Sequence, residues 1–180
     1  MPFYDGPLIQ GDLVQLASDG HFDVILHGCN CQHAMGSGVA KALATRFPDI
    51  LAADRQTRKD DPSKLGTYSH AVVRLASGAP LVILNGYTQR YYGKMHYQGA
   101  AFDMDALHRL CDAVLHRLGG RGLRFGYPLL GGDRGKADPY AVLQLLNSRF
   151  SGETHTLVYQ QEPGRKTPSC LLPRLKRELN

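Results

Sequence analysis

Apolar positions along the chain form short runs that alternate with helical spacings, and this predicts alternating strands and helices. The runs that we expect to be strands are 8–14 (broken by a Gly-Asp pair), 24–27, 66–73, 81–89, 124–130 and 154–160. The spacings that we expect to be helices are 39–47, 102–118 and 139–150, with a shorter helix from residue 49. This order predicts an α/β fold with a largely parallel sheet.

The stretch 24–47 joins an apolar strand, a turn with Gly36 and Gly38, and a helix that Pro48 ends. The first N–H groups of a helix have no intrahelical partner, and the helix dipole places partial positive charge there. Glycines let a diphosphate approach the backbone closely. The P-loop signature is absent, and Lys41 stands where the dinucleotide fingerprint has its third glycine. The stretch predicts either a site for a phosphate-bearing ligand or a bent turn without a ligand.

Length and composition are those of one globular domain, with 180 residues, 43% hydrophobic and 21% charged. We expect a single domain over 1–162 and a basic, proline-containing tail over 163–180. No apolar run approaches the ~20 residues of a membrane span, and no signal peptide is evident. We therefore expect a cytoplasmic protein without membrane contact. The formal charge of +5 favours anionic ligands. Without an RNA-binding motif, it does not indicate nucleic acid.

The cysteines do not have the spacing of a metal or redox site, since the sequence contains no C-x-x-C. We expect them to be small buried hydrophobic residues and predict no metal site. The alternative is a catalytic thiolate next to His27 or His33. The residues concerned are Cys29, Cys31, Cys111 and Cys170.

The stretch H-G-C-N-C-x-x-x-M-G-S-G-V-A, residues 27–40, resembles the first ligand loop of macrodomains, the α/β modules that bind ADP-ribose. It is most similar to the branch with ADP-ribose-1''-phosphate phosphatases and the terminal ADP-ribose protein glycohydrolase. Further matches are Gly-Asp-Leu at 11–13, the Thr-Gln and Tyr-Tyr-Gly run at 88–93, and the glycine-rich loop at 128–138. The resemblance implies a three-layer sandwich, with a mixed, largely parallel sheet and helices on both faces, and no cofactor.

The resemblance also implies ligand contacts. Asp12 would accept a hydrogen bond from the adenine amino group, Asn30 would contact the distal ribose, and both glycine-rich loops would enclose the diphosphate. A simple turn is the alternative at Gly11 and Asp12. The residues that we expect to contact the ligand are Gly11, Asp12, Leu13, Asn30, Met35, Gly36, Ser37, Gly38, Val39, Gln89, Tyr92, Pro128, Leu130, Gly131, Gly132 and Gly135.

Asp138, Asp133 and His33 are the candidate acid–base groups beside the distal ribose. Overlay on the phosphatase-like branch places Asp138 at that branch's loop aspartate, while the glycohydrolase's catalytic aspartate lies nearer Asp133. Each has a structural alternative. Asp138 would be a helix cap before Pro139, Asp133 an exposed turn carboxylate, and His33 a solvated loop histidine. The glycohydrolase's nucleophilic lysine falls at or next to Ala101, so we do not expect a lysine adduct.

The function implied is binding of ADP-ribose or a derivative, either free or on an ADP-ribosylated protein. Hydrolysis would remove a phosphate or a protein side chain from the terminal ribose. Two alternatives remain open at this point. One is a non-catalytic reader of ADP-ribose, and the other is a basic module that binds RNA or nucleotides.

Overall fold

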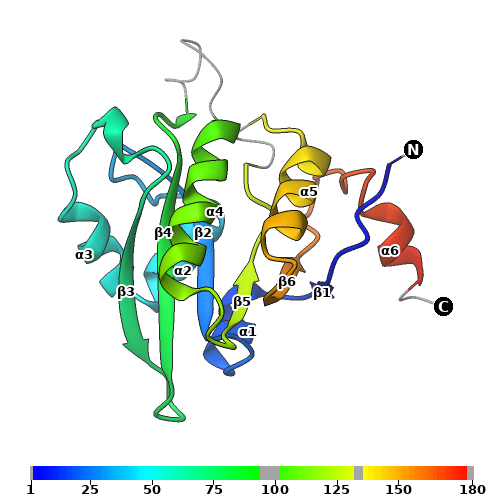
Figure 1. Ribbon diagram of the computed structural model, residues 1–180, viewed down its shortest axis with the longest axis horizontal. Helices are drawn as coiled ribbons and strands as arrows, with labels where there is room; N and C mark the ends of the chain where they lie inside the picture. The colour runs from blue at the N-terminus through cyan, green and yellow to red at the C-terminus, as the bar shows by residue number, and fades with distance from the viewer. Residues whose placement is uncertain (1, 94–101, 132–135, 178–180) are drawn as a thin grey trace.

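The computed structural model of the protein describes residues 2–93, 102–131 and 136–177 (Figure 1). In these ranges the strands are β1 (Leu8–Gln10), β2 (Val24–Asn30), β3 (Tyr68–Arg74), β4 (Pro80–Gln89), β5 (Arg124–Tyr127) and β6 (Thr154–Tyr159). The helices are α1 (Leu13–Ser18), α2 (Gly38–Arg46), α3 (Asp49–Arg55), α4 (Met104–Leu118), α5 (Pro139–Arg149) and α6 (Leu172–Arg177), with a 3-10 helix η1 (Pro62–Lys64).

The strands form one sheet in the order β1-β6-β5-β2-β4-β3. Neighbouring strands are parallel, except that β3 at the edge is antiparallel to β4. The carboxyl ends of the parallel strands therefore meet at one end of the sheet, where open α/β sheets bind their ligands. The predicted α/β fold with a largely parallel sheet is confirmed.

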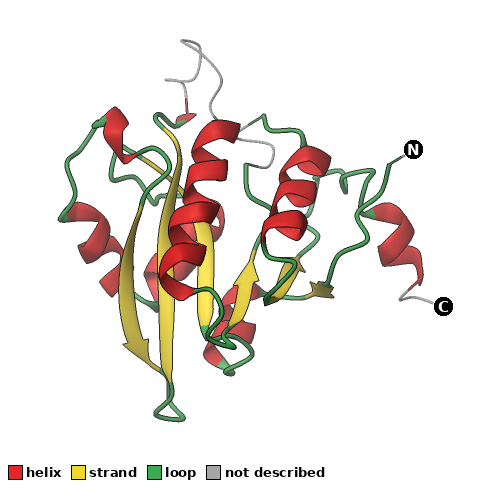
Figure 2. Ribbon diagram, in the orientation of Figure 1, coloured by secondary structure: helices red, strands yellow, loops and turns green. Residues whose placement is uncertain are grey.

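Helices cover both faces of the sheet (Figure 2). One hydrophobic cluster joins α4 and α5 to the sheet, and a second joins α1, α2 and α3 to the opposite face. Along β2, Val24 and Leu26 belong to the first cluster, while Ile25 and Cys29 belong to the second. This alternation is what a strand buried on both faces requires. None of the helices in the described ranges is long and apolar enough to cross a membrane.

The structure differs from the sequence prediction just after residue 10. The expected strand over 8–14 ends at Gln10, and helix α1 begins at Leu13. The carboxylate of Asp12 caps this helix by accepting a hydrogen bond from the N–H of Gln15 at 3.0 Å. A helix of six residues is too short to form by propensity alone. The burial of Leu13 and Ala17 against the sheet stabilises it instead.

The segment expected to be a tail packs against the rest of the protein in its described part. Leu171 is fully buried and Cys170 nearly so, within the same cluster as α5. The carbonyl of Cys170 accepts a hydrogen bond from the N–H of Tyr4 at 2.8 Å. Helix α6 follows and lies beside the N-terminal segment (Figure 1).

Candidate functional site

A cavity of about 570 Å³ lies at the carboxyl ends of β1, β5 and β6. Its walls come from four places: the turn that enters α1, the first turns of α2, the loop after β5, and the chain that follows β6. The lining residues are Gly11, Asp12, Leu13, Val14, Gly38, Val39, Ala42, Pro128, Leu129, Lys136, Ala137, Pro139, Val158, Tyr159, Gln160, Glu162, Arg165, Lys166 and Pro168. The sequence-predicted residues Gly11, Asp12, Leu13, Gly38, Val39 and Pro128 are thus brought together.

Asp12 is exposed at the cavity and fixed in position by its role as a helix cap. Its Oδ1 accepts the hydrogen bond from Gln15, so the carboxylate has a defined orientation. The second oxygen, Oδ2, is available as an acceptor. An amino group of a planar ring is a donor of the kind that this oxygen can bind.

The first glycine loop, residues 36–38, leads into α2 with its backbone open to solvent. Added Cβ atoms at Gly36 and Gly38 would meet nothing within 4 Å, so protein packing does not require glycine at either position. Gly38 has a φ of 59°, in the left-handed region that glycine adopts most easily. Ser37 precedes the helix but makes no side-chain cap bond. The first N–H groups of α2 are therefore available to an anion at the cavity.

In the loop after β5, by contrast, packing does require glycine at position 131. Gly131 has a φ of 66°, and an added Cβ would lie 2.5 Å from the Phe102 ring. The carbonyl of Gly131 accepts a hydrogen bond from the N–H of Ala137 at 3.1 Å, so the two ends of the loop are held together. The predicted residues Gly132, Asp133 and Gly135 lie outside the described residues.

Met35 and Leu130 are core residues, at 8% and 2% exposure, in the clusters on opposite faces of the sheet. Asn30 is also buried and holds its own loop, since its Nδ2 donates to the Ala34 carbonyl at 2.8 Å. Its Oδ1 accepts from the N–H of Gln32 at 2.9 Å. These three residues shape the loops that border the cavity, and their contacts with a ligand stay predictions.

Gln89 and Tyr92 lie at the end of β4 and just beyond it. The Nε2 of Gln89 donates to the carbonyl of Tyr91 at 2.9 Å, and Tyr92 is exposed. Neither residue is among those that line the cavity. Their expected contacts with a ligand also stay predictions.

Asp138 caps α5: its Oδ1 accepts a hydrogen bond from the N–H of Tyr140 at 3.0 Å, and Pro139 is the first helical residue. The cap predicted from the Asp-Pro pair is therefore present. Asp138 is exposed, and its neighbours Ala137 and Pro139 line the cavity. The capping role and a role at the cavity are compatible, because only one carboxylate oxygen makes the cap.

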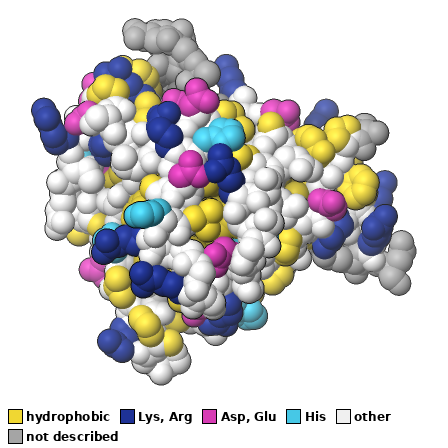
Figure 3. Space-filling view, viewed as in Figure 1, with side chains coloured by type: hydrophobic (Ala, Val, Ile, Leu, Met, Phe, Trp, Pro, Cys, Tyr) yellow, Lys and Arg dark blue, Asp and Glu magenta, His cyan; other side chains and the backbone are white. Residues whose placement is uncertain are grey.

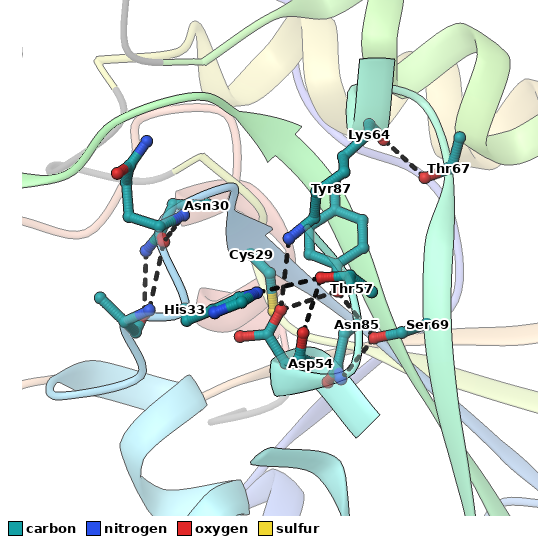
Figure 4. Close-up of polar contacts among 12 residues, drawn as sticks. Cys29, Asn30, His33, Asp54, Thr57, Lys64, Thr67, Ser69, Asn85 and Tyr87 are labelled. Atoms are coloured by element: carbon teal, nitrogen blue, oxygen red, sulfur yellow. Dashed lines mark hydrogen bonds and ion pairs between the residues drawn. The ribbon is translucent and has the colours of Figure 1, made fainter. Parts of the chain in front are cut away.

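His33 points toward α3 (Figure 4). Its Nε2 lies 3.1 Å from Thr57 Oγ1, and that hydroxyl donates to the carbonyl of Asp54 at 2.6 Å. The hydroxyl oxygen must then accept from Nε2–H, which places a proton on that nitrogen. The backbone of His33 is left-handed, with a φ of 58°. The side chain is thus engaged by the protein and is not among the residues that line the cavity.

A buried ion pair lies next to this contact (Figure 4). Lys64 Nζ lies 3.7 Å from Asp54 Oδ1, and the side chains are 7% and 1% exposed. The hydroxyl of Tyr87 donates to the same oxygen at 2.7 Å, and Nζ lies 4.2 Å from the centre of the Tyr87 ring. Nζ has no hydrogen-bond partner within the described part of the chain. Charge pairing and the aromatic ring therefore hold the ammonium group.

The buried hydrogen bonds continue, through Asn85, to His27 on β2. The Asn85 amide donates to the Ile50 carbonyl at 2.9 Å and to Ser69 Oγ at 3.0 Å. Its Oδ1 therefore accepts from His27 Nε2, at 2.8 Å, and the neutral ring carries its proton there. Burial lowers the pKa of His27 to about 4. At neutral pH the imidazole is an uncharged donor that links β2 to Asn85 on β4.

This lowered pKa predicts an acid-dependent loss of stability. Well above pH 6.5 His27 is neutral in both states, whereas between pH 6.5 and about 4 the unfolded chain binds the proton more strongly than the folded protein. Between pH 7 and 4.5 the linkage lowers the free energy of unfolding by about 2 kcal/mol. Urea unfolding of the unaltered protein, His27→Gln and the exposed-site control His70→Gln should show a shallower pH dependence for His27→Gln alone. If the free energy of unfolding depended on pH equally in all three proteins, the prediction would be wrong.

The four cysteines are buried and have no disulfide partner. Burial raises the pKa of Cys31 to about 11 and that of Cys111 to about 12, and it also raises the values of Cys29 and Cys170. Such thiols are not nucleophiles at neutral pH. This favours the small-hydrophobe interpretation over a thiolate beside His27. In the described ranges, no group of three or more His, Cys, Asp or Glu side chains could hold a metal ion.

The structure adds lining residues that sequence reasoning missed. Lys136 lies in the loop after β5, and Glu162, Arg165, Lys166 and Pro168 come from the segment after β6. The only sequence signal for them was the excess of basic residues. On the face with α4 and α5, Lys and Arg side chains are spread out with Asp and Glu between them (Figure 3). That face therefore carries no single basic patch.

The chain is similar to known proteins both in sequence and in structure. No family model matches the chain. It is 55% identical over 62 residues to an uncharacterized 17.5 kDa protein in the tk-vs intergenic region of Enterobacteria phage T4, covering 34% of this chain and 39% of that protein. It is 34% identical over 88 residues to the ADP-ribose 1''-phosphate phosphatase of Aspergillus fumigatus, covering 42% of each. The matches thus span about two fifths of the length of these curated relatives.

Solved structures match over most of the chain. The macrodomain of Mycobacterium tuberculosis DarG superimposes with a TM-score of 0.65 at 19% identity, covering 87% of this chain and 97% of that one. Thermosipho africanus DarTG in complex with ADP-ribose gives a TM-score of 0.64 at 14% identity, covering 92% and 44%. Together with the mixed sheet and its helices on both faces, these likenesses show that the protein has the macrodomain fold.

Proposed function

We propose that the protein binds ADP-ribose or a derivative of it in the cavity at the carboxyl ends of β1, β5 and β6. The observation that carries this proposal is the composition of the walls: a fixed carboxylate, Asp12, on one side and the N-terminus of α2 after an open glycine loop on another. A volume of about 570 Å³ suits a ligand of nucleotide size. The likeness to a macrodomain protein solved in complex with ADP-ribose supports the choice of ligand.

The parts of the ligand are assigned from the resemblance to macrodomains, with which the chemistry of the walls agrees. Asp12 accepts from the adenine amino group, and the diphosphate lies across Gly38 and the first N–H groups of α2. Pro128 and Gly131, at the start of the loop after β5, would border the diphosphate and the distal ribose. The terminal ribose then points toward the region of Asn30.

We further propose that the protein hydrolyses a group from this terminal ribose, either a phosphate or a protein side chain. The similarity to an ADP-ribose 1''-phosphate phosphatase supports this activity. Asp138 is the first candidate to activate the attacking water, followed by Asp133 and His33. Backbone N–H groups of the loops would hold the diphosphate during the reaction.

A non-catalytic reader is the second candidate function. One observation favours it, because the described acid–base candidates have protein partners: Asp138 caps α5, and His33 is bound to Thr57. Binding of ADP-ribose without turnover of ADP-ribose-1''-phosphate or ADP-ribosylated protein would establish the reader.

Replacing Asp12 by asparagine tests the binding site. Asparagine caps helices as well as aspartate does, but the atom facing the adenine becomes an NH₂ donor where an acceptor is needed. We expect affinity for ADP-ribose, measured by calorimetry, to fall about tenfold or more. Thermal unfolding should change little.

Asp103→Asn is the matched control. Asp103 caps α4 in the same way, accepting from the N–H of Ala106 at 2.9 Å, and does not line the cavity. Its substitution should leave the affinity unchanged. Equal affinities for Asp12→Asn and Asp103→Asn would show that Asp12 does not contact the ligand.

A further inference from the structure

The residues that follow β6 form one wall of the cavity, although from residue 163 onward the sequence predicted only a basic tail. Gln160, Glu162, Arg165, Lys166 and Pro168 all line the cavity. We call residues 160–168 the C-terminal wall. None of the ligand contacts proposed above uses this wall.

The C-terminal wall is held in place by hydrogen bonds around Gln161. The hydroxyl of Tyr159 donates to Gln161 Oε1 at 3.0 Å, and Gln161 Nε2 donates to the carbonyl of Arg165 at 2.6 Å. The hydroxyl of Thr167 donates to the same Oε1. The N–H of Arg165 closes a turn onto the carbonyl of Glu162 at 3.1 Å. These bonds, with the buried residues 170–171 that follow, fix the wall relative to the sheet.

The C-terminal wall carries more positive than negative charge. Arg165 Nη1 lies 2.8 Å from Glu162 Oε2, so these opposite charges compensate one another. Lys166 makes no ion pair within the described residues and is exposed at the cavity. The wall therefore presents a net positive charge to whatever occupies this side of the cavity.

The order of the strands places this charge away from the expected diphosphate. The first glycine loop follows β2, whereas the C-terminal wall follows β6, which pairs with β1 at the edge of the sheet. The adenine acceptor, Asp12, comes directly after β1. Figure 1 shows α6 and the N-terminal segment on the β1 side of the molecule, away from α2. The ammonium group of Lys166 therefore lies on the side of the cavity that we expect adenosine to occupy. The adenosine part of ADP-ribose carries no charge.

We propose that the C-terminal wall recognises an anionic group attached to the adenosine ribose, with Lys166 as the specificity-determining residue and Arg165 as its neighbour. This inference rests on the proposed binding of ADP-ribose and adds the substrate class to it. The anionic group could come from a phosphate on the 2'-hydroxyl or from the next unit of an ADP-ribose chain. Both would present phosphate oxygens to an ammonium group, which binds them as a point charge.

The test compares three probes by calorimetry: ADP-ribose, 2'-phospho-ADP-ribose and a linear ADP-ribose dimer. At low salt the unaltered protein should bind one of the extended probes about tenfold more tightly than ADP-ribose. Lys166→Gln should abolish that preference while leaving affinity for ADP-ribose within about twofold. Arg177→Gln, an exposed cation on α6 that does not line the cavity, should retain it.

The outcomes separate the two proposals. Preference for the phosphorylated monomer or for the dimer, lost in Lys166→Gln, supports the inference and identifies the source of the anion. Equal affinity for all three probes in the unaltered protein overturns the inference but leaves ADP-ribose binding intact. A preference that persists in Lys166→Gln also overturns it. Absence of binding by every probe overturns the proposed function itself.

Discussion

Replacing Lys64 by methionine is expected to lower the free energy of unfolding by about 3–5 kcal/mol. The substitution removes the cation that faces Asp54, whose side chain is 1% exposed. A buried carboxylate without its partner carries the full cost of desolvation, and the hydroxyl of Tyr87 alone does not replace a charge. Urea unfolding followed by circular dichroism measures the change.

Two further variants test whether the unpaired charge of Asp54 causes this loss of stability. In Lys64→Met combined with Asp54→Asn, no buried charge remains and the new amide oxygen still accepts from Tyr87, so most of the lost stability should return. Arg58→Met removes a cation from a surface pair with Asp61, in which the arginine is 90% exposed. It should cost less than about 1 kcal/mol. A double variant less stable than Lys64→Met would show that the pair is not what stabilises this region.

Asp138→Asn is expected to lower the turnover of the active substrate, ADP-ribose-1''-phosphate or ADP-ribosylated protein, about 100-fold or more. Asparagine keeps the cap on α5, because its side-chain oxygen can still accept from the N–H of Tyr140. It cannot take a proton from water. Thermal unfolding should therefore change little while the rate of phosphate or ADP-ribose release falls.

Asp61→Asn is the matched control for this substitution. Asp61 also precedes a proline and caps a helical turn, with Oδ1 accepting from the N–H of Ser63 at 2.9 Å. It does not line the cavity, so its substitution should leave turnover unchanged. Full turnover in Asp138→Asn would leave Asp138 as a helix cap only. Absence of turnover in the unaltered protein on both substrates would contradict the proposed hydrolase.

Periodicity in the sequence was sufficient to predict the α/β class with a largely parallel sheet. The apolar runs at β2 and β4 are buried on both faces, so they read as strands without ambiguity. The spacing over 102–118 marks a single amphipathic helix, which became α4. Where one strand leads through glycines into a helix, as at Gly36 and Gly38, the local pattern also predicts the place of the ligand.

Features that depend on tertiary contacts were not predictable. Residues 13–14 were expected to be the end of a strand, and only the packing of Leu13 and Ala17 against the sheet makes this segment α1. Asp54 and Lys64 are separated by a charged, polar stretch, and nothing local indicates that both are buried. Lys166 lies in a segment without periodicity, so its position at the cavity follows from the hydrogen bonds around Gln161 rather than from any motif.

Titration of ADP-ribose into the unaltered protein by calorimetry tests the central claim most directly. We expect saturable binding of one ligand per chain, accompanied by a rise in thermal stability as the ligand concentration increases. No heat of binding and no change in thermal stability at millimolar ADP-ribose would contradict it. The chain would then have the macrodomain fold without its ligand, and the cavity would serve another molecule.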